Sequence, residues 1–447
     1  MEPSTPGDSA TTPSDAGAPP DAGASPDLRP RDPDTAVDRL LIPVLLLVVA
    51  AAVYAWINNG RAVNLDYFIP LADAFLHGRL GLENAPSWLN EVVPVGDLSY
   101  VVYPPAPALL VLPVVAAFGP EVNQAWPSIG FGALNVAIVS LVLRRMGVGR
   151  GPRVILALVF AFGTITWYSA QAGSSWHFAH VAATLFMLTA IWLCQRDGPP
   201  ALIGLAFAAA AMSRLPVAMA APFFIAYFID RDLRAATGDH TPFGWLGPDR
   251  PKAWRTRPNL PSVLRTAWPA GLEVGLVILA YLLYNNARFG SPWENGYALI
   301  PGLLQEAQYQ HGFFSVVNIP RILYAMALTV PAQVADFPWV QPRRLGGMSI
   351  FLTTPLFLWV VKARRPDWFG LGAWASILLI FIPILAHADP GGMQFGFRYA
   401  QDLYPMLLLL TVRGLGGRIS TEAWIAIAVG GVVNAWGMVS AYYDWWA

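Results

Sequence analysis

Long apolar stretches recur from residue 39 onward, and their length limits most strongly what this chain can fold into. A helix needs about 20 apolar residues to cross a bilayer. Candidate stretches, several of them shorter than this, lie near 39–58, 127–144, 153–170, 179–195, 200–213, 216–230, 268–286, 348–362, 368–387, 402–413 and 422–441. Only 13% of the residues are charged, whereas a soluble domain carries about 25%. The sequence therefore predicts an all-α polytopic membrane protein with about 11 transmembrane helices.

Residues 1–38 differ from the rest of the chain. They contain eight prolines, no aromatic residue, and eight acidic residues against Arg29 and Arg31. Such a segment cannot bury enough apolar surface to offset the entropy lost on ordering. It is also too long and too acidic for a signal peptide. We expect a disordered cytoplasmic tail over 1–38 and a multi-span transmembrane domain over 39–447.

The distribution of Lys and Arg predicts the orientation. With the N-terminus in the cytoplasm, 20 of the 28 basic residues fall in inside loops and 8 fall outside, as the positive-inside rule requires. Two long segments, 59–126 and 287–347, are then extracytoplasmic. Their apolar parts, 105–118 and 319–331, are too short to cross the bilayer and are expected to lie in its interface.

Composition and motifs exclude several classes of function. The 28 basic and 28 acidic residues balance, which argues against a nucleic-acid partner. Cys194 is the only cysteine, so no disulfide framework is possible. The chain has no GxxxxGK[ST], HExxH or CxxC motif, and nucleotide hydrolysis is therefore not supported.

The first long outside segment contains the most informative acidic residue, Asp66. Apolar residues follow it at helical spacing, which predicts an amphipathic helix ending near Gly78. An acidic residue at this place has two interpretations. It either caps the helix N-terminus or serves as a general base at the membrane surface. Further along, Tyr103-Pro104-Pro105 precedes a short apolar helix that ends at Phe118-Gly119.

Together these features resemble the integral-membrane GT-C glycosyltransferases. Residues 60–120 carry the resemblance, which is greatest to the family 39-like group of protein mannosyltransferases and the aminoarabinose transferase of lipid A. The family's acidic residue after the first span matches Asp66. Two positions differ, because Tyr67 stands where the family often has a second acid and Tyr103 where it often has Lys. The resemblance implies transfer of a sugar from a polyprenyl-phosphate carrier on the outer membrane face.

Two arginines are candidates for binding the carrier phosphate. Arg214 lies at the break between two short apolar stretches, where an unpaired guanidinium costs about 2.5–3.5 kcal/mol on insertion scales. It is expected to bind a lipid phosphate, to reach the interface, or to pair with an acid. Arg398 could also hold a phosphate, or it could pair with Asp402 at i,i+4.

Further polar side chains are candidates for a sugar or acceptor pocket. His177 and His180 share a helix face at i,i+3, and pocket histidines are favoured over a metal site because no third ligand lies nearby. Tyr103, Asn285, Glu294 and Asp402 belong to clusters of amides, acids and aromatic rings at the outer ends of spans. Such clusters suit sugars and equally suit an interfacial aromatic belt. No cofactor is predicted, and a role for a divalent metal is left open.

These observations favour an inverting glycosyltransferase. Asp66 would take the proton of an acceptor hydroxyl on a glycan, lipid or protein, while Arg214 and Arg398 stabilise the departing phosphate. Membrane lipids and the polyprenyl-phosphate sugar are the expected partners. A transporter or lipid flippase is the alternative, but it predicts polar residues near the bilayer midplane. A ligase or polymerase of whole glycans would share the outer-face location.

Overall fold

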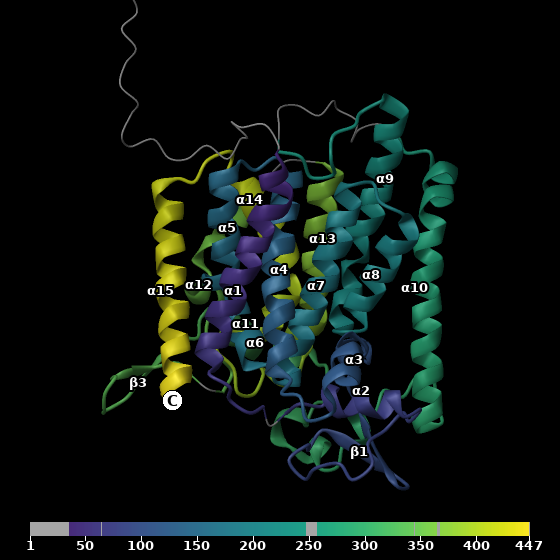
Figure 1. Ribbon diagram of the computed structural model, residues 1–447, viewed down its shortest axis with the longest axis vertical. Helices are drawn as coiled ribbons and strands as arrows, with labels where there is room; N and C mark the ends of the chain where they lie inside the picture. Colours follow the sequence, from purple (N-terminus) through teal and green to yellow (C-terminus); the bar gives the residue numbers. More distant parts are fainter. Residues whose placement is uncertain (1–34, 64, 247–256, 344, 364–366, 447) are drawn as a thin grey trace, which may run out of the picture.

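The computed structural model describes residues 35–63, 65–246, 257–343, 345–363 and 367–446, and most of these residues form a helical bundle (Figure 1). The α-helices are α1 (Ile42–Asn58), α2 (Phe68–Leu76), α3 (Ala106–Phe118), α4 (Ala125–Arg145), α5 (Arg150–Phe162), α6 (Thr166–Ala172), α7 (Ser175–Gln195), α8 (Pro200–Ala211), α9 (Ala221–Thr237), α10 (Leu260–Phe289), α11 (Ile319–Ala327), α12 (Ile350–Thr353), α13 (Trp368–Ala386), α14 (Tyr404–Gly414) and α15 (Thr421–Tyr443). Short helical turns include η1 (Val37–Leu41), η2 (Leu215–Ala220), η8 (Pro355–Lys362) and η9 (Arg398–Leu403). The strands β1 (Val92–Val95) and β2 (Leu98–Val101) form one antiparallel hairpin, and β3 (Ala332–Gln333) and β4 (Val340–Gln341) form another.

Membrane-length helices coincide with the predicted apolar stretches. Within the described ranges, six helices are long and apolar enough to span a membrane, and α5 with α6 makes a seventh candidate bent by 54°. The predicted stretches at 200–213, 216–230, 348–362 and 402–413 form shorter helical segments, namely α8, η2 with α9, α12 with η8, and η9 with α14. The chain is therefore a multi-pass membrane protein, and the count of 11 spans stays a prediction.

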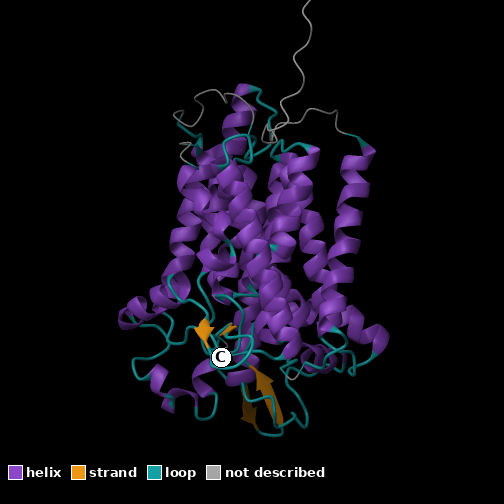
Figure 2. Ribbon diagram, turned by 90° about the vertical axis from the view of Figure 1, so that its left-hand side faces the viewer, coloured by secondary structure: helices purple, strands orange, loops and turns teal. Residues whose placement is uncertain are grey.

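The two long segments that separate the spans lie at one end of the bundle. In Figure 1, α2, α3, β1 and β3 lie toward the lower end with the C-terminus, whereas α1 begins at the upper end. Figure 2 shows the strands and most long loops at this same lower end. We call it the outer end and the opposite end the inner end. The orientation of these ends relative to the cytoplasm stays a prediction.

Both short helices expected in the first long segment are present. α2 buries Phe68 and Leu71 in the main core. α3 begins directly after Pro104-Pro105, and the backbone N–H of Ala106 donates to the carbonyl of Met212 at 3.2 Å. The start of α3 is thereby attached to the outer end of α8.

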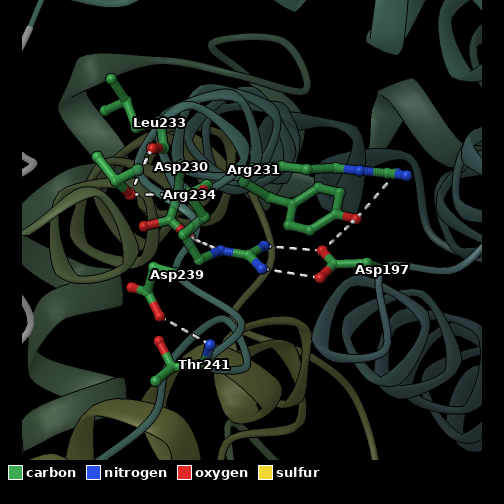
Figure 3. Close-up of polar contacts among 9 residues, drawn as sticks. Asp197, Asp230, Arg231, Leu233, Arg234, Asp239 and Thr241 are labelled. Carbon is green, nitrogen blue, oxygen red and sulfur yellow. Dashed lines mark hydrogen bonds and ion pairs between the residues drawn. The ribbon is translucent and has the colours of Figure 1, made fainter.

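A buried arginine holds helices together at the inner end. Arg234 on α9 is 5% exposed and donates two 2.7 Å hydrogen bonds to the carboxylate of Asp197, which lies beyond α7. It donates a third, of 2.8 Å, to Asp230 one turn earlier (Figure 3). Arg231 lies beside this pair and contacts it through the Tyr227 hydroxyl. The guanidinium thus joins α9 to the end of α7.

The last residue of the predicted tail, Asp38, contacts the helical bundle. Residues 1–34 lie outside the described residues. Asp38, the last residue of the predicted tail, is buried in the η1 turn and pairs with Arg153 at 2.6 Å and Arg150 at 2.8 Å. A charged residue that finds two partners inside a bundle is ordered by them, so Asp38 packs with the helical bundle, and the boundary between tail and transmembrane domain stays a prediction.

Candidate functional site

A cluster of polar side chains lies where α7 and η9 meet near the outer end. α7 begins after Ser174, whose extended backbone ends the preceding turn, and it carries Trp176, His177 and His180 in its first two turns. η9 leads directly into α14, and every residue of both elements is buried. The break between α8 and η2 supplies Arg214. We call these side chains, with the loop residues that contact them, the outer polar cluster.

Asp402 is the centre of a buried hydrogen-bond network. His180 Nδ1 lies 2.7 Å from Asp402 Oδ1, and both side chains are fully buried. The guanidinium of Arg214 lies 3.3 Å from Asp402 Oδ2 through Nη2 and 3.4 Å from Oδ1 through Nε. The alternative that Arg214 pairs with an acid is therefore correct. The alternative pair of Arg398 with Asp402 is wrong, because Asp402 is bonded to Arg214 and His180 instead.

Arg398 is a buried cation of the outer polar cluster that has few hydrogen-bond partners among the described residues. It is 6% exposed, and the one hydrogen bond that its side chain makes with described residues goes from Nη2 to the Tyr399 hydroxyl at 3.3 Å. Within the described residues, its Nε and Nη1 atoms are buried and have no partner. The guanidinium lies 4.9 Å from the ring centre of Trp176 and 5.1 Å from that of Tyr399. A buried cation of this kind costs several kcal/mol, which an anionic ligand would offset.

The two histidines have different partners. His177 Nδ1 lies 2.7 Å from the Ser174 hydroxyl, and its ring packs edge-on against Tyr168, whereas His180 contacts Asp402. In the described part of the chain, the Nε2 atoms of both rings are buried without a partner. Among the residues that the structure describes, no group of three or more His, Cys, Asp or Glu side chains could hold a metal ion.

Glu91, Trp176 and Tyr103 form the outer wall of the cluster. The indole Nε1 of Trp176 donates to Glu91 Oε2 and to the Tyr103 hydroxyl, each at 2.7 Å. Burial raises the pKa of Glu91, an effect that the Trp176 hydrogen bond and the charge of Arg398 oppose and that the nearby Asp389 and Glu306 reinforce. Glu91 and Trp176 were missed as candidates. A single acid in a loop and a single tryptophan at a span end carry no sequence signal that distinguishes them.

Asp66 lies beside the cluster without touching its cations. The backbone N–H of Ser175 donates to the carbonyl of Leu65 at 2.7 Å, which places Asp66 next to the start of α7. Among described residues, no other side chain forms a hydrogen bond or ion pair with its carboxylate. The N-cap residue of α2 is Tyr67, which makes no side-chain cap, so the N-cap interpretation of Asp66 is wrong. Burial raises the pKa of Asp66; a hydrogen bond from its own backbone N–H opposes this effect, and the charge of Glu121 adds to it.

Aromatic contacts connect the neighbourhood of Asp66 to Arg398. The ring of Tyr67 packs edge-on against Tyr103 with 5.2 Å between centres. Tyr103 accepts the hydrogen bond from Trp176, whose face lies against Arg398. The candidate base and the candidate phosphate-binding residue therefore lie at the same end of the bundle, separated by a short row of aromatic side chains.

Asn285 and Glu294 make local contacts rather than contacts with the cluster. Asn285 accepts a 2.8 Å hydrogen bond from Arg288, whose other nitrogen donates to the carbonyl of Val101 on β2. Glu294 accepts the backbone N–H of Gly296 at 2.7 Å within a turn. These contacts tie the end of α10 to the outer hairpin. Their predicted role in a sugar pocket stays a prediction that none of these contacts supports.

Comparison with known proteins finds no matching family model and no matching curated protein. One similar solved structure is the crystal structure of ArnT from Cupriavidus metallidurans bound to undecaprenyl phosphate. The two share 14% sequence identity with a TM-score of 0.46, and the match covers 91% of this chain. This chain spans 65% of the length of that structure.

Proposed function

We propose that this protein is a GT-C-type glycosyltransferase that moves a sugar from a polyprenyl-phosphate donor to an acceptor hydroxyl on the extracytoplasmic face. The observation that carries the proposal is the buried Arg398 guanidinium, two of whose nitrogens have no partner among the described residues. A charged donor in a site of low dielectric binds a phosphate strongly. The sequence resemblance over residues 60–120 supports the same class of reaction.

The donor phosphate would sit against Arg398, with Arg214 nearby. The guanidinium carbons of both arginines lie over the ring of Tyr399, at 5.1 and 5.4 Å from its centre. Asp402 already neutralises Arg214, whereas Arg398 has no acidic partner in the described structure. Arg398 therefore supplies the uncompensated positive charge, and the Arg214–Asp402 ion pair, which is neutral, lies against the same Tyr399 ring. The free Nε2 atoms of His177 and His180, together with Tyr103, are the groups that we assign to the sugar or acceptor.

The proposed reaction is a single displacement. Asp66 takes the proton of the acceptor hydroxyl while that oxygen bonds to the anomeric carbon, a contribution of about 10²–10⁴ in rate. The bond from the anomeric carbon to the phosphate oxygen breaks, and its electron pair leaves on polyprenyl phosphate. Arg398 stabilises the charge that develops on this oxygen. The configuration at the anomeric carbon inverts.

The test uses purified protein in nanodiscs with a panel of radiolabelled polyprenyl-phosphate sugars and crude envelope acceptors. We expect label to move to an acceptor in the wild type, and not in Asp66→Asn or Arg398→Gln. A flippase would move the lipid between leaflets with the glycosidic bond intact, and a ligase would transfer only whole glycans. Either result, with no transfer from any monosaccharide donor, would contradict the proposal.

A further inference from the structure

We propose that Glu91 is a positioning residue for the lipid phosphate. Through the indole of Trp176, it holds the Arg398 guanidinium in the orientation that leaves two nitrogens free for an anion. This inference rests on the proposed function, because it assumes that Arg398 binds the donor phosphate. It adds a residue that neither the sequence pattern nor the family resemblance indicates.

Arg398 is oriented by aromatic faces rather than by a carboxylate. The hydrogen bond from its side chain to the Tyr399 hydroxyl is long at 3.3 Å. The Trp176 and Tyr399 rings, at 4.9 and 5.1 Å, are the remaining groups that hold its plane. A carboxylate in their place would neutralise the guanidinium and occupy its donors. Aromatic faces attract the cation and leave its N–H groups available.

The orientation of Trp176 depends in turn on Glu91. The indole has a single donor, and Nε1 directs it to Glu91 Oε2 and the Tyr103 hydroxyl at 2.7 Å each. A ring flip would take this N–H away from both oxygens and change the face presented to Arg398. Glu91 lies immediately before β1, 85 residues from Trp176. The β1–β2 hairpin thereby fixes a side chain on α7, and through it the cation on η9.

Glu91 also places a negative charge near the phosphate site, which opposes anion binding. Its charged neighbours are Arg398 on η9, Asp389 in the loop after α13, and Glu306 in the segment after α10. The hydrogen bond to Trp176 therefore favours phosphate binding, and the charge weakens it. Since these two effects have opposite signs, substitutions that separate them can test the proposal.

The experiment measures binding of tritiated undecaprenyl phosphate to the full chain in nanodiscs. Glu91→Gln keeps an oxygen that accepts the Trp176 N–H and removes the charge, so its affinity should equal or exceed that of the wild type. Glu91→Ala removes both and should bind about tenfold more weakly, the typical effect of losing one cation–aromatic contact in a desolvated site. Trp176→Phe keeps a ring without the N–H and should lose a similar factor.

The double variant Glu91→Ala/Trp176→Phe should bind no more weakly than either single variant, because both act through one contact. Asp97→Ala is the matched control, since Asp97 is an exposed acid at the turn of the same hairpin, and it should bind like the wild type. If Glu91→Ala misfolds, the affinities of Trp176→Phe and Glu91→Gln for undecaprenyl phosphate still test the proposal. Wild-type affinity in Trp176→Phe, or a Glu91→Gln variant as weak as Trp176→Phe, would overturn the inference. Undiminished binding in Arg398→Gln would instead overturn the proposed function.

Discussion

Replacing Asp402 by Ala should be among the most destabilising single changes at the outer end. Its side chain is fully buried and accepts hydrogen bonds from His180 and from Arg214, whose side chain is 20% exposed. Removing one partner of a buried ion pair costs about 3–5 kcal/mol, because the other charge is left uncompensated. The partial exposure of Arg214 moves the expected loss toward about 3 kcal/mol.

Two further variants separate charge from shape at this site. Asp402→Asn keeps an oxygen for the His180 N–H, and we expect a loss of about 2 kcal/mol. In Asp402→Ala/Arg214→Met both charges are gone, and apolar replacement of a buried pair is often neutral. We therefore expect the double variant to recover at least half of the loss. Reversible unfolding in mixed micelles of increasing SDS fraction measures these differences in unfolding free energy. A double variant less stable than Asp402→Ala would refute the assignment of Asp402 as the counter-ion of Arg214.

Three other expectations follow from particular contacts. A Cβ on Gly347, whose φ is +69°, would overlap the backbone of Gly396, whereas a Cβ on Gly346, whose φ is +75°, would lie 3.8 Å from Pro390. The unfolding free energy of Gly347→Ala should therefore be lower than that of Gly346→Ala by about 2 kcal/mol in the same assay, since overpacking costs about 1–3 kcal/mol. Equal stability of the two variants would contradict the close approach of Gly347 to Gly396. Arg234→Ala should lose about 3 kcal/mol of unfolding free energy, the lower end of the cost of breaking a buried ion pair, because it removes the guanidinium that joins Asp230 to the 38% exposed carboxylate of Asp197. Arg231→Ala breaks hydrogen bonds of 3.4 and 3.3 Å, and it should lose under about 1 kcal/mol. The pKa of Glu91 is raised in the folded state, so lowering the pH through that pKa should remove its charge. Relative to Glu91→Gln, the wild type should then bind polyprenyl phosphate more tightly and gain unfolding free energy. A ratio of the two binding affinities that does not change with pH would show that the Glu91 charge has no effect on the phosphate site.

The helices were predictable from the sequence because apolar length is a local property. The stretch predicted at 39–58 corresponds to α1, and the stretch at 368–387 corresponds to α13. α10 extends well beyond the predicted 268–286 at its N-terminal end, because polar residues such as Arg265 at the end of a span do not stop a helix. The β1–β2 hairpin was missed, although Gly96-Asp97 between two apolar runs is a typical two-residue turn.

The site was less predictable because its contacts join distant parts of the chain. Arg214 and Asp402 are 188 residues apart, and no local pattern indicates that they meet. The predicted pair of Arg398 and Asp402 assumed α-helical spacing, in which residues four apart share a face. These residues lie in the 3-10 helix η9, where three residues complete a turn and the i,i+4 side chains diverge. The sequence indicated Arg214 and Arg398 as candidate phosphate-binding residues, but no local pattern predicts that Arg398 is the one with two buried nitrogens that have no partner among the described residues.

The most direct test of the account is the affinity of the protein for a polyprenyl phosphate before and after removal of the Arg398 charge. Two charge-assisted hydrogen bonds contribute about 1.5–3 kcal/mol each, so Arg398→Gln should bind tritiated undecaprenyl phosphate at least about 100-fold more weakly. Arg398→Lys keeps the charge without the planar donors, and its affinity for undecaprenyl phosphate should lie between those of the wild type and Arg398→Gln. Wild-type affinity in a folded Arg398→Gln protein would show that the phosphate is held elsewhere and would contradict the account.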